Sequence, residues 1–342
     1  MNKEINILAI ESSCDETAAA VIADGRHIRS NIISSQIAVH QPYGGVVPEI
    51  ASRCHLQAIV PVVKAAMKEA KLEFSDLDAV AVSSGPGLVG ALLVGVSYAK
   101  ALAQAIVKPL ISVNHWQGHI SAVFLEHDIE YPFIALVASG SHSGIVEARG
   151  AGIYRLLGSS RDDAAGEAFD KIARALGLGY PGGPQIEKAA LNGDKDYCQF
   201  PRAYLEKDSY DFSFSGLKSA VLNYLNQRAM KGDPVQPPEV PHLAAAAQEA
   251  ITSVLAEKTL LAATELRYKR IVLAGGVAAN KRLRQLFEQI KTKDIELFYP
   301  STLYCTDNAA MIGVAAYDKY LASDFASVDL NADPRQNIYA KS

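Results

Sequence analysis

The sequence predicts an α/β protein of two related lobes, each a mixed β-sheet with flanking helices. At 342 residues the chain is long enough for two lobes. Short apolar runs alternate with helical stretches, and the order of three strands, helix, strand, helix and strand occurs twice. Three meandering strands followed by helical crossovers are typical of a mixed sheet. We expect a first lobe of residues 1–130 plus about 308–342, a second lobe of residues 131–307, and an active site in the cleft between them.

The first lobe is expected to hold five strands. They are the apolar runs at residues 5–11, 18–23, 28–34, 77–83 and 110–114. Asp24-Gly25 is the turn signal between the second and third of these runs. Long helical stretches at residues 48–70 and 88–105, together with a final helix at 307–320, complete this lobe.

The second lobe begins with the same arrangement of strands. Its strands are expected at residues 133–139, 143–148, 153–157, 270–276 and 295–299. Helices are expected at residues 164–176, 186–191, 215–229, 243–266 and 278–290. The Pro-rich segment at residues 231–240 is expected to be a surface loop. The two lobes share the order of their helices and strands, but no short-period repeat of the amino-acid sequence is visible.

Composition limits the class of protein. The net charge is −4, so no basic excess indicates nucleic-acid binding, although a local basic patch fits within such a total. Four scattered cysteines without a C-x-x-C pair favour reduced thiols and a cytoplasmic location. The apolar N-terminal run is too short for a signal peptide or a membrane span. We therefore expect a cytoplasmic protein without membrane contact.

The stretch "NHWQGH" contains a candidate metal site. His115 and His119 stand four residues apart, which on a helix places both imidazoles on one face. Such a pair is more often structural, but Asp307 in "CTDNAA" is available as a third ligand, with a helix N-cap as its simpler role. Two histidines and an aspartate suit zinc or iron. Trp116 stands where a zinc protease has its glutamate base, so proteolysis is not expected.

Two glycine turns follow strands. The motif Gly85-x-Gly87-x-x-Gly90 matches the dinucleotide fingerprint, but it follows the fourth strand, not the first. A tight structural turn, a loop beside a phosphate and NAD binding therefore all remain open. Gly275-Gly276 allows a flat ligand to lie against the backbone, and Asn280 offers an amide nearby. A pair of such turns suggests a nucleotide between the lobes.

Polar groups gather early in the second lobe. Asp162, Asp163 and Glu167 are expected to complement the dipole of the helix that they begin, whereas Asp170 lies one turn further. The stiff "GYPGGP" loop precedes the next helix. The polar turns "ESSCDET" and "ASGSHSG" match each other in the two lobes and suit phosphate or carbonyl oxygens, although a plain hairpin is the default.

Five motifs together resemble one family. They are "NHWQGH", "DDAAGEAFDKIARALGLGYPGGP", "YDFSFSGLK", "AGGVAAN" and "CTDNAA". They resemble the universal tRNA threonylcarbamoyladenosine transferase family, whose bacterial branch, TsaD, was formerly labelled an O-sialoglycoprotein endopeptidase. The resemblance runs from "ILAIESSCDETAAAV" nearly to the C-terminus. It implies the duplicated actin/hexokinase/Hsp70-like fold, which agrees with the repeated element order.

The resemblance implies a metal-dependent acyltransferase. The implied reaction moves threonylcarbamoyl from threonylcarbamoyl-AMP to the adenosine 3′ of the anticodon in tRNAs that read A-starting codons. It implies His115, His119 and Asp307 as ligands of one divalent metal per subunit, iron before zinc. The implied substrate-binding residues are Val137, Ala138, Ser139, Gly140, Ser141, Asp170, Gly183, Glu187 and Asn280. It also implies a TsaB-like paralogue and a TsaE-like ATPase as partners, and no catalytic base is assigned.

The chain departs from the family pattern twice. Gln117 replaces the glutamate of H-x-E-G-H, and Ser141 replaces a glycine of S-G-G-H-T. Two alternatives share the expected fold. One is a non-catalytic nucleotide-binding scaffold, which is expected to lack the histidine pair. The other is an ATP-hydrolysing actin-like protein or sugar kinase, in which Asp170 would serve as base.

Overall fold

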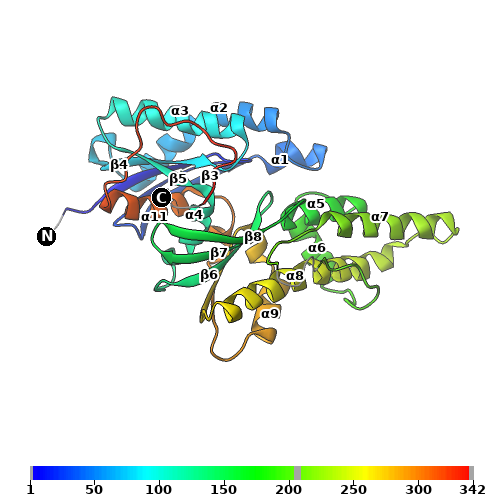
Figure 1. The fold of residues 1–342 in the computed structure, drawn as a ribbon. Helices are drawn as coiled ribbons and strands as arrows, with labels where there is room; N and C mark the ends of the chain where they lie inside the picture. The colour runs from blue at the N-terminus through cyan, green and yellow to red at the C-terminus, as the bar shows by residue number, and fades with distance from the viewer. Residues whose placement is uncertain (1–2, 204–208, 339–342) are drawn as a thin grey trace. The chain divides into compact units, whose positions relative to one another are not determined.

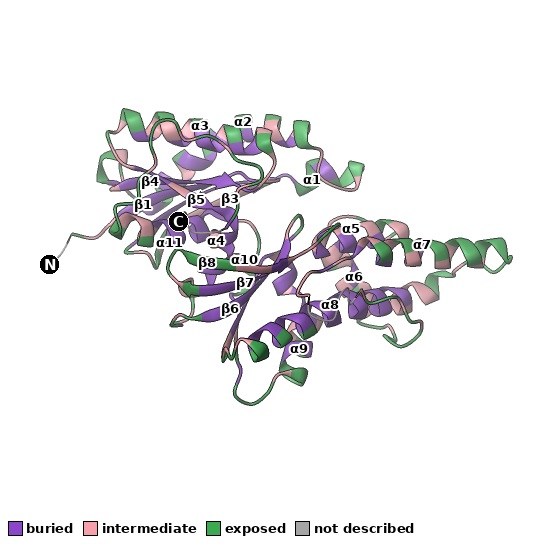
Figure 2. Cartoon of the chain, in the orientation of Figure 1, coloured by how far each residue is buried: buried purple, intermediate pink, exposed green. Residues whose placement is uncertain are grey.

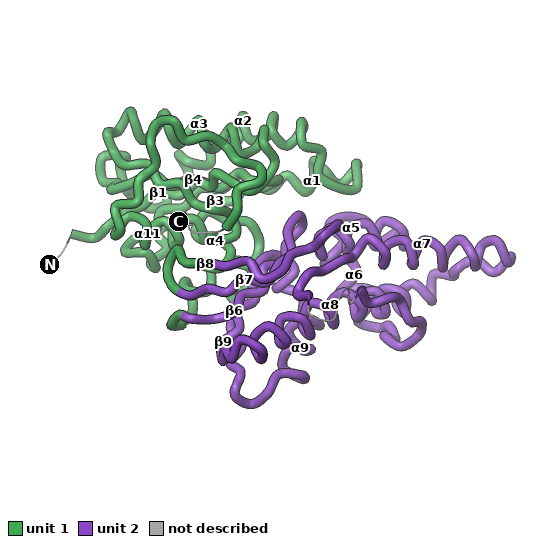
Figure 3. The backbone as a smooth tube through the Cα atoms, viewed as in Figure 1, with its two compact units in different colours: residues 1–131, 150–154, 300–342 green, residues 132–149, 155–299 purple. Residues whose placement is uncertain are grey.

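The computed structural model describes residues 3–203 and 209–338, and its chain forms two compact units (Figure 3). Unit 1 consists of Met1–Tyr131, Gly150–Tyr154 and Pro300–Ser342. Unit 2 consists of Pro132–Arg149 and Arg155–Tyr299. The chain thus leaves unit 1 after Tyr131, returns to it at Gly150–Tyr154, and returns again at Pro300 before the last helix.

Unit 1 is built on a five-stranded mixed sheet with the strand order β3-β2-β1-β4-β5 (Figure 1). The strands are β1 (Asn6–Glu11), β2 (Glu16–Ala23), β3 (His27–Ser35), β4 (Ala79–Gly85) and β5 (Leu110–Asn114). β1 pairs antiparallel with β2 and parallel with β4, and β5 continues the parallel half. The predicted meander followed by parallel crossovers is confirmed.

Both faces of this sheet are covered by helices (Figure 2). Leu8 and Ile10 point to the face covered by α2 (Pro48–Ala70) and α3 (Val89–Ala105). Their neighbours Ile7 and Ala9 point to the opposite face, where α11 (Ala309–Leu321) packs. A strand buried on both faces has no polar position to alternate with, which explains the continuous apolar runs. The shorter elements of unit 1 are α1 (Ile37–His40), η1 (Gln41–Tyr43), η2 (Phe74–Asp76), α4 (His115–Ser121), η3 (Ala122–Leu125) and α10 (Thr302–Cys305).

Unit 2 repeats this sheet in the order β10-β9-β6-β7-β8. Its strands are β6 (Phe133–Ala138), β7 (Ser143–Gly150), β8 (Ile153–Ser159), β9 (Arg270–Ala274) and β10 (Glu296–Phe298). Its helices are α5 (Ala165–Ala175), α6 (Gly182–Ala190), α7 (Ser215–Met230), η4 (Pro237–Glu239), α8 (Val240–Glu265), η5 (Gly276–Ala279) and α9 (Lys281–Ile290). The middle strand, β6, pairs antiparallel with β7 and parallel with β9, as β1 does with β2 and β4. The predicted repeat of element order is confirmed.

Local details differ from the sequence-based expectations. α6 begins at Gly182, four residues early, because the Asp170 carboxylate accepts a hydrogen bond from the Gly182 amide at its first turn. The Pro-rich segment is partly helical, since the 3-10 turn η4 spans Pro237–Glu239 and α8 already begins at Val240. Asp162 does not serve its own helix: it accepts hydrogen bonds from the backbone amides of Phe214 and Ser215 at the start of α7. Its expected role at the dipole of α5 is therefore wrong.

The glycine motif after β4 is a packed turn. A Cβ at Gly85 would lie 2.9 Å from the carbonyl carbon of Asp333, and one at Gly87 would lie 2.6 Å from the Ser13 oxygen. The following amide, that of Leu88, donates to the same Ser13 oxygen. Side-chain-free positions are required here because other parts of the chain fill the space. The structure favours the structural turn over NAD or phosphate binding.

Within residues 3–203 and 209–338, no helix combines the length and apolar character that a membrane crossing requires.

Candidate functional site

The histidine pair lies at the start of α4, immediately after β5. Asn114 caps this helix, because its side-chain oxygen accepts hydrogen bonds from the amides of Trp116 (2.9 Å) and Gln117 (3.4 Å). The rings of His115 and His119 then stand with centroids 4.5 Å apart, as helical spacing predicts. Both side chains are buried.

A glycine brings α4 against α11. A Cβ at Gly118 would lie 2.7 Å from the end of the Ile312 side chain of α11, so a larger residue would require that side chain to shift. The close packing sets the histidines beside the segment that precedes α11. The glycine of "NHWQGH" therefore shapes the site although it offers no ligand atom.

Asp307 completes a group of three donors. Its Oδ1 lies 3.1 Å from His119 Nε2 and 3.6 Å from His115 Nε2. One ligand atom from each of the three residues lies within 4.8 Å of the others. The simpler alternative for Asp307, the N-cap of α11, is wrong: the cap is Asn308, whose side chain accepts from the Met311 amide. Because Asn308 caps the helix, the Asp307 carboxylate is not used for capping and lies beside the two imidazoles.

His119 shows that these residues fit a metal ion. Its ring is buried, and neither ring nitrogen makes an aligned hydrogen bond with any residue that the structure describes. Buried polar atoms without partners are rare and destabilising, and a bound cation would satisfy one of the two ring nitrogens. Burial, followed by the neighbouring His115, lowers the pKa of His119 and favours the neutral imidazole that binds metals. Two imidazoles and one carboxylate are a typical donor set for zinc or iron.

Sequence reasoning missed the residue behind His115. Glu11, the last residue of β1, has its Oε2 3.0 Å from His115 Nδ1, and the Ser13 hydroxyl lies 3.1 Å from the same nitrogen. Burial lowers the pKa of His115, but the carboxylates of Glu11 and Asp307 outweigh it and raise the pKa to about 9. A glutamate directly after the apolar run "ILAI" was the available signal.

The predicted substrate residues lie in unit 2, beginning with the turn between β6 and β7. Val137 and Ala138 are fully buried, so only their backbone is available to a ligand. The Ser139 amide donates to the His142 carbonyl, which closes the turn. The start of α5 packs on this turn, since the Gly166 amide donates to the Ser139 carbonyl at 3.1 Å. The structure therefore joins the polar turn to a helix N-terminus, a favourable setting for an anion.

The exposed tip of this turn carries one departure from the family. A Cβ at Gly140 would meet nothing within 4 Å. Ser141 is exposed, and its hydroxyl lies 3.1 Å from His142 Nδ1. The additional side chain thus lies at the surface, beside His142.

The other predicted substrate residues form a connected group around α6. Asp170 binds the Gly182 amide, and Glu187 accepts from the Lys281 amide at 2.6 Å. A Cβ at Gly183 would meet nothing within 4 Å, so this position faces open space. These contacts link α5 and α6 to the start of α9.

Asn280 differs from expectation. Its amide was expected to be available to a ligand, but the side-chain oxygen caps α9 through the Leu283 amide. Its Nδ2 donates to Gln248 at 2.9 Å, and the residue is 7% exposed. Asn280 therefore fixes the local backbone and leaves little of its amide for binding.

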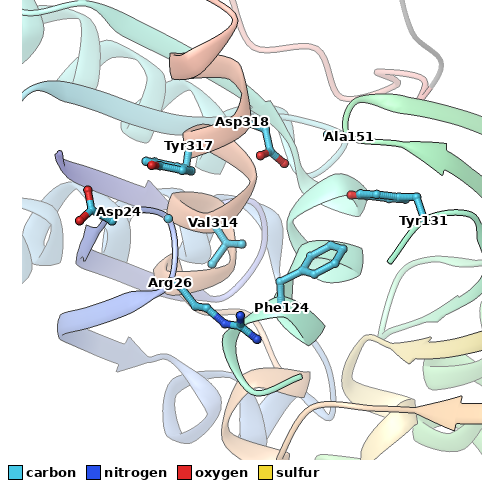
Figure 4. Close-up of a pocket in the computed structure, with 9 residues that line it drawn as sticks. Asp24, Arg26, Phe124, Tyr131, Ala151, Val314, Tyr317 and Asp318 are labelled. Carbon is cyan, nitrogen blue, oxygen red and sulfur yellow. The ribbon is translucent and has the colours of Figure 1, made fainter. Parts of the chain in front are cut away.

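A cavity of about 220 Å³ also lies in unit 1 (Figure 4). It is lined by residues of the β2–β3 turn, η3 and α11, among them Arg26, Tyr317 and Asp318. It shares no residue with the histidine group or with the predicted substrate positions.

The whole chain is similar to proteins of one described family. The family model "TsaD: tRNA N6-adenosine threonylcarbamoyltransferase" matches residues 27–314. A protein of that name from Moorella thermoacetica is 58% identical over 333 residues, covering 97% of this chain and 96% of that protein. One from Clostridium botulinum strain Kyoto is 54% identical over 340 residues, covering 99% of each chain.

Solved structures show the same fold at low identity. Full-length HypF, in its phosphate- and nucleotide-bound form, has a TM-score of 0.63 at 15% identity, over 95% of this chain and 57% of that chain. Component A of the Acidaminococcus fermentans (R)-2-hydroxyglutaryl-CoA dehydratase has a TM-score of 0.54 at 14% identity, over 93% and 99% of the two chains. Together with the two repeated five-stranded sheets, they confirm the predicted actin-like fold class. The extent of the family match and the identities over nearly the full length establish that the chain belongs to the tRNA N6-adenosine threonylcarbamoyltransferase family.

Proposed function

We propose that this protein is a metal-dependent acyltransferase that transfers threonylcarbamoyl from threonylcarbamoyl-AMP to the adenosine 3′ of the anticodon in tRNAs that read A-starting codons. The observation that carries the metal requirement is the convergence of His115, His119 and Asp307 in a buried site whose second histidine has unsatisfied ring nitrogens. The family membership carries the acyl transfer and the tRNA substrate.

Carbamoyl transfer requires a carbonyl group held in place and a developing oxyanion that is stabilised. When bound, a divalent metal supplies a Lewis acid for this purpose. His115, His119 and Asp307 would hold it, with iron before zinc, since both metals accept imidazole and carboxylate ligands. The turn at Ser139–Ser141 and the open side of Gly183 would bind the adenylate.

A covalent enzyme intermediate is not part of the proposal. Cys14 lies close in sequence to Glu11, but burial and then the neighbouring Asp15 raise the pKa of its thiol well above the usual range. A thiol in this state is a poor nucleophile because the thiolate is the reactive form. Direct attack by the adenosine amine on the bound carbonyl needs no such residue.

The proposal extends to the setting of the reaction. It keeps the expectation of an active site in the cleft between the lobes and of a cytoplasmic protein. A TsaB-like paralogue and a TsaE-like ATPase are the expected protein partners. The near-neutral net charge of −4 is consistent with tRNA binding shared among subunits.

Depletion of the protein in its host tests the function. Mass spectrometry of tRNA nucleosides should show the loss of N6-threonylcarbamoyladenosine, and expression of the wild-type chain should restore it. The Asp307→Ala chain should not restore it although it reaches the same cellular level. Unchanged modification after depletion would refute the proposed activity.

We expect Gln117→Glu to change the enzyme only modestly. Gln117 lies two residues from each histidine, so its side chain points away from the edge that they share. A carboxylate at position 117 would influence the metal and its histidine ligands through the electric field of its charge, and it would not bind the metal directly. Metal content measured by atomic emission should stay at that of the wild type, and the transfer rate should change by no more than about tenfold. Metal content that rises from none to one per chain would show that the natural chain does not hold the ion.

Gly183→Val is expected to weaken nucleotide binding without destabilising the fold. A side chain at Gly183 meets no protein atom within 4 Å and would extend into the space assigned to the ligand. Titration calorimetry with AMP should show at least about tenfold weaker binding, equivalent to about 1.4 kcal/mol. Gly216→Val is the matched control, because Gly216 also lies in the first turn of a helix with open space around it. Equal AMP affinity in both variants would place the nucleotide elsewhere.

A further inference from the structure

Glu11 is a buried carboxylate at the end of an apolar strand. All six residues of β1 are buried, and Glu11 itself is 0% exposed. A carboxylate in such a position is strongly destabilising unless hydrogen bonds satisfy its oxygens. Both oxygens have partners: Oε1 accepts from the Ser13 amide, and Oε2 lies 3.0 Å from His115 Nδ1. These two contacts define which way the carboxylate faces.

We propose that Glu11 is a positioning residue that fixes the orientation and the proton of His115, so that the His115 Nε2 lone pair is directed at the metal. This inference rests on the proposed metal site. An ionised carboxylate only accepts hydrogen bonds, so the Nδ1 of His115 must carry the proton that Glu11 receives. With Nδ1 holding that proton, the opposite nitrogen, Nε2, is the one that would give up its proton and bind when a metal is present, and it lies 3.6 Å from Asp307.

The backbone determines which way the side-chain amide would face in Glu11→Gln. The Ser13 amide is a fixed donor, so in Glu11→Gln the side-chain oxygen must face Ser13. The NH₂ group must then face His115 Nδ1, where it meets either an N–H or a lone pair. To avoid opposing donors, the imidazole would move its proton to Nε2, the nitrogen needed by the metal. A substitution that preserves shape therefore reverses the hydrogen-bond direction.

The other histidine provides an internal contrast. The ring nitrogens of His119 have no aligned hydrogen-bond partner among the described residues, whereas His115 has a carboxylate and the Ser13 hydroxyl on Nδ1. Glu11 therefore acts on one ligand of the three. Partners of this kind typically change metal affinity by about 10–100-fold when they are removed.

The affinity test compares Glu11→Gln with the wild-type chain by competition for Zn²⁺ against a chromophoric chelator. We expect about 10–100-fold weaker binding with an unchanged saturating stoichiometry. Glu147→Gln is the matched control, because Glu147 is also a buried carboxylate but lies in unit 2 with Arg149 and Arg155. Its zinc affinity should equal that of the wild type. Tight binding by the wild type and equally tight binding by Glu11→Gln would overturn the role of Glu11 and leave the metal site standing.

Nitrogen-15 NMR of the zinc-loaded wild-type chain tests the proton directly and needs no variant to fold. We expect His115 to be protonated on Nδ1, with a far-downfield hydrogen-bonded proton, and metal-bound through Nε2. In Glu11→Gln that downfield signal should disappear. A His115 bound through Nδ1, or a signal unchanged in Glu11→Gln, would contradict the assignment. A wild-type chain that binds no metal would overturn the metal site, and this inference with it.

Discussion

A chain with His119→Leu is expected to lose its metal and its transferase activity while remaining at least as stable as the metal-free wild type. The ring of His119 is buried, and its nitrogens make no aligned hydrogen bond with the described residues. A leucine of similar volume removes two buried ring nitrogens and gives up only the 3.1 Å contact of Nε2 with Asp307. We expect this to be neutral or stabilising for the fold, because the Asp307 carboxylate is partly exposed to water. The same change removes one of the three predicted ligands. Urea unfolding of the metal-free chains should therefore show no loss of stability in His119→Leu, whereas metal analysis should show that the variant holds no metal.

His55→Leu is the control for this prediction. His55 is also fully buried, but its Nδ1 lies 2.7 Å from the Thr17 hydroxyl and its Nε2 lies 2.9 Å from the Cys14 carbonyl. Its removal leaves two buried groups without partners, so the free energy of unfolding should fall by about 1–3 kcal/mol per unsatisfied group. If His119→Leu destabilises the metal-free chain as much as His55→Leu, or still holds one metal per chain, His119 is a structural histidine.

Asp307→Ala extends the same argument to the carboxylate. The cap of α11 is Asn308, so removal of the Asp307 side chain leaves the helix start intact. We expect the metal to be lost with little change in the melting temperature of the metal-free chain. The two substituted residues belong to different elements: His119 lies on α4, and Asp307 lies in the segment before α11.

The fold was predictable where local pattern and burial agree. Residues buried on both faces of a sheet form unbroken apolar runs, so β1 and β4 were recognisable from composition alone. The helix at Pro48–Ala70 matches the expected bounds, since a proline opens it and Lys71 ends it in a left-handed conformation. Because the strand order repeats, the same local signals predicted both sheets.

Contacts between distant segments explain what the sequence did not reveal. Asp162 was assigned to its own helix because the amides it binds, on Phe214 and Ser215, lie about fifty residues away. Glu11 was missed for the same reason, since His115 is 104 positions further along the chain. The donor group itself was found because two of its ligands share one helical face, the single part of that site encoded by local spacing.

Gly275→Ala is expected to be among the most destabilising single substitutions in unit 2. Gly275 has φ +88° and ψ 165°, a region of backbone conformation that is essentially restricted to glycine. A Cβ there would lie 2.7 Å from the carbonyl carbon of Ala138, at the end of the neighbouring strand β6. Strain of about 1–3 kcal/mol and overpacking of about 1–3 kcal/mol act together, so the free energy of unfolding should fall by roughly 2–6 kcal/mol.

The functional effect of this substitution should follow from the same contact. Relief of the clash requires the backbone at Ala138 to move, and the Ser139–Ser141 turn proposed to bind the adenylate follows directly. Chains that remain folded should therefore bind AMP more weakly. Gly152→Ala is the matched control, because Gly152 also has a positive φ, +72°, but a Cβ there meets nothing within 4 Å. Its cost should be limited to backbone strain, about 1–2 kcal/mol. If urea unfolding gives the two variants equal losses, Gly275 is required only for its backbone angles, and the close approach of β9 to β6 does not explain the glycine.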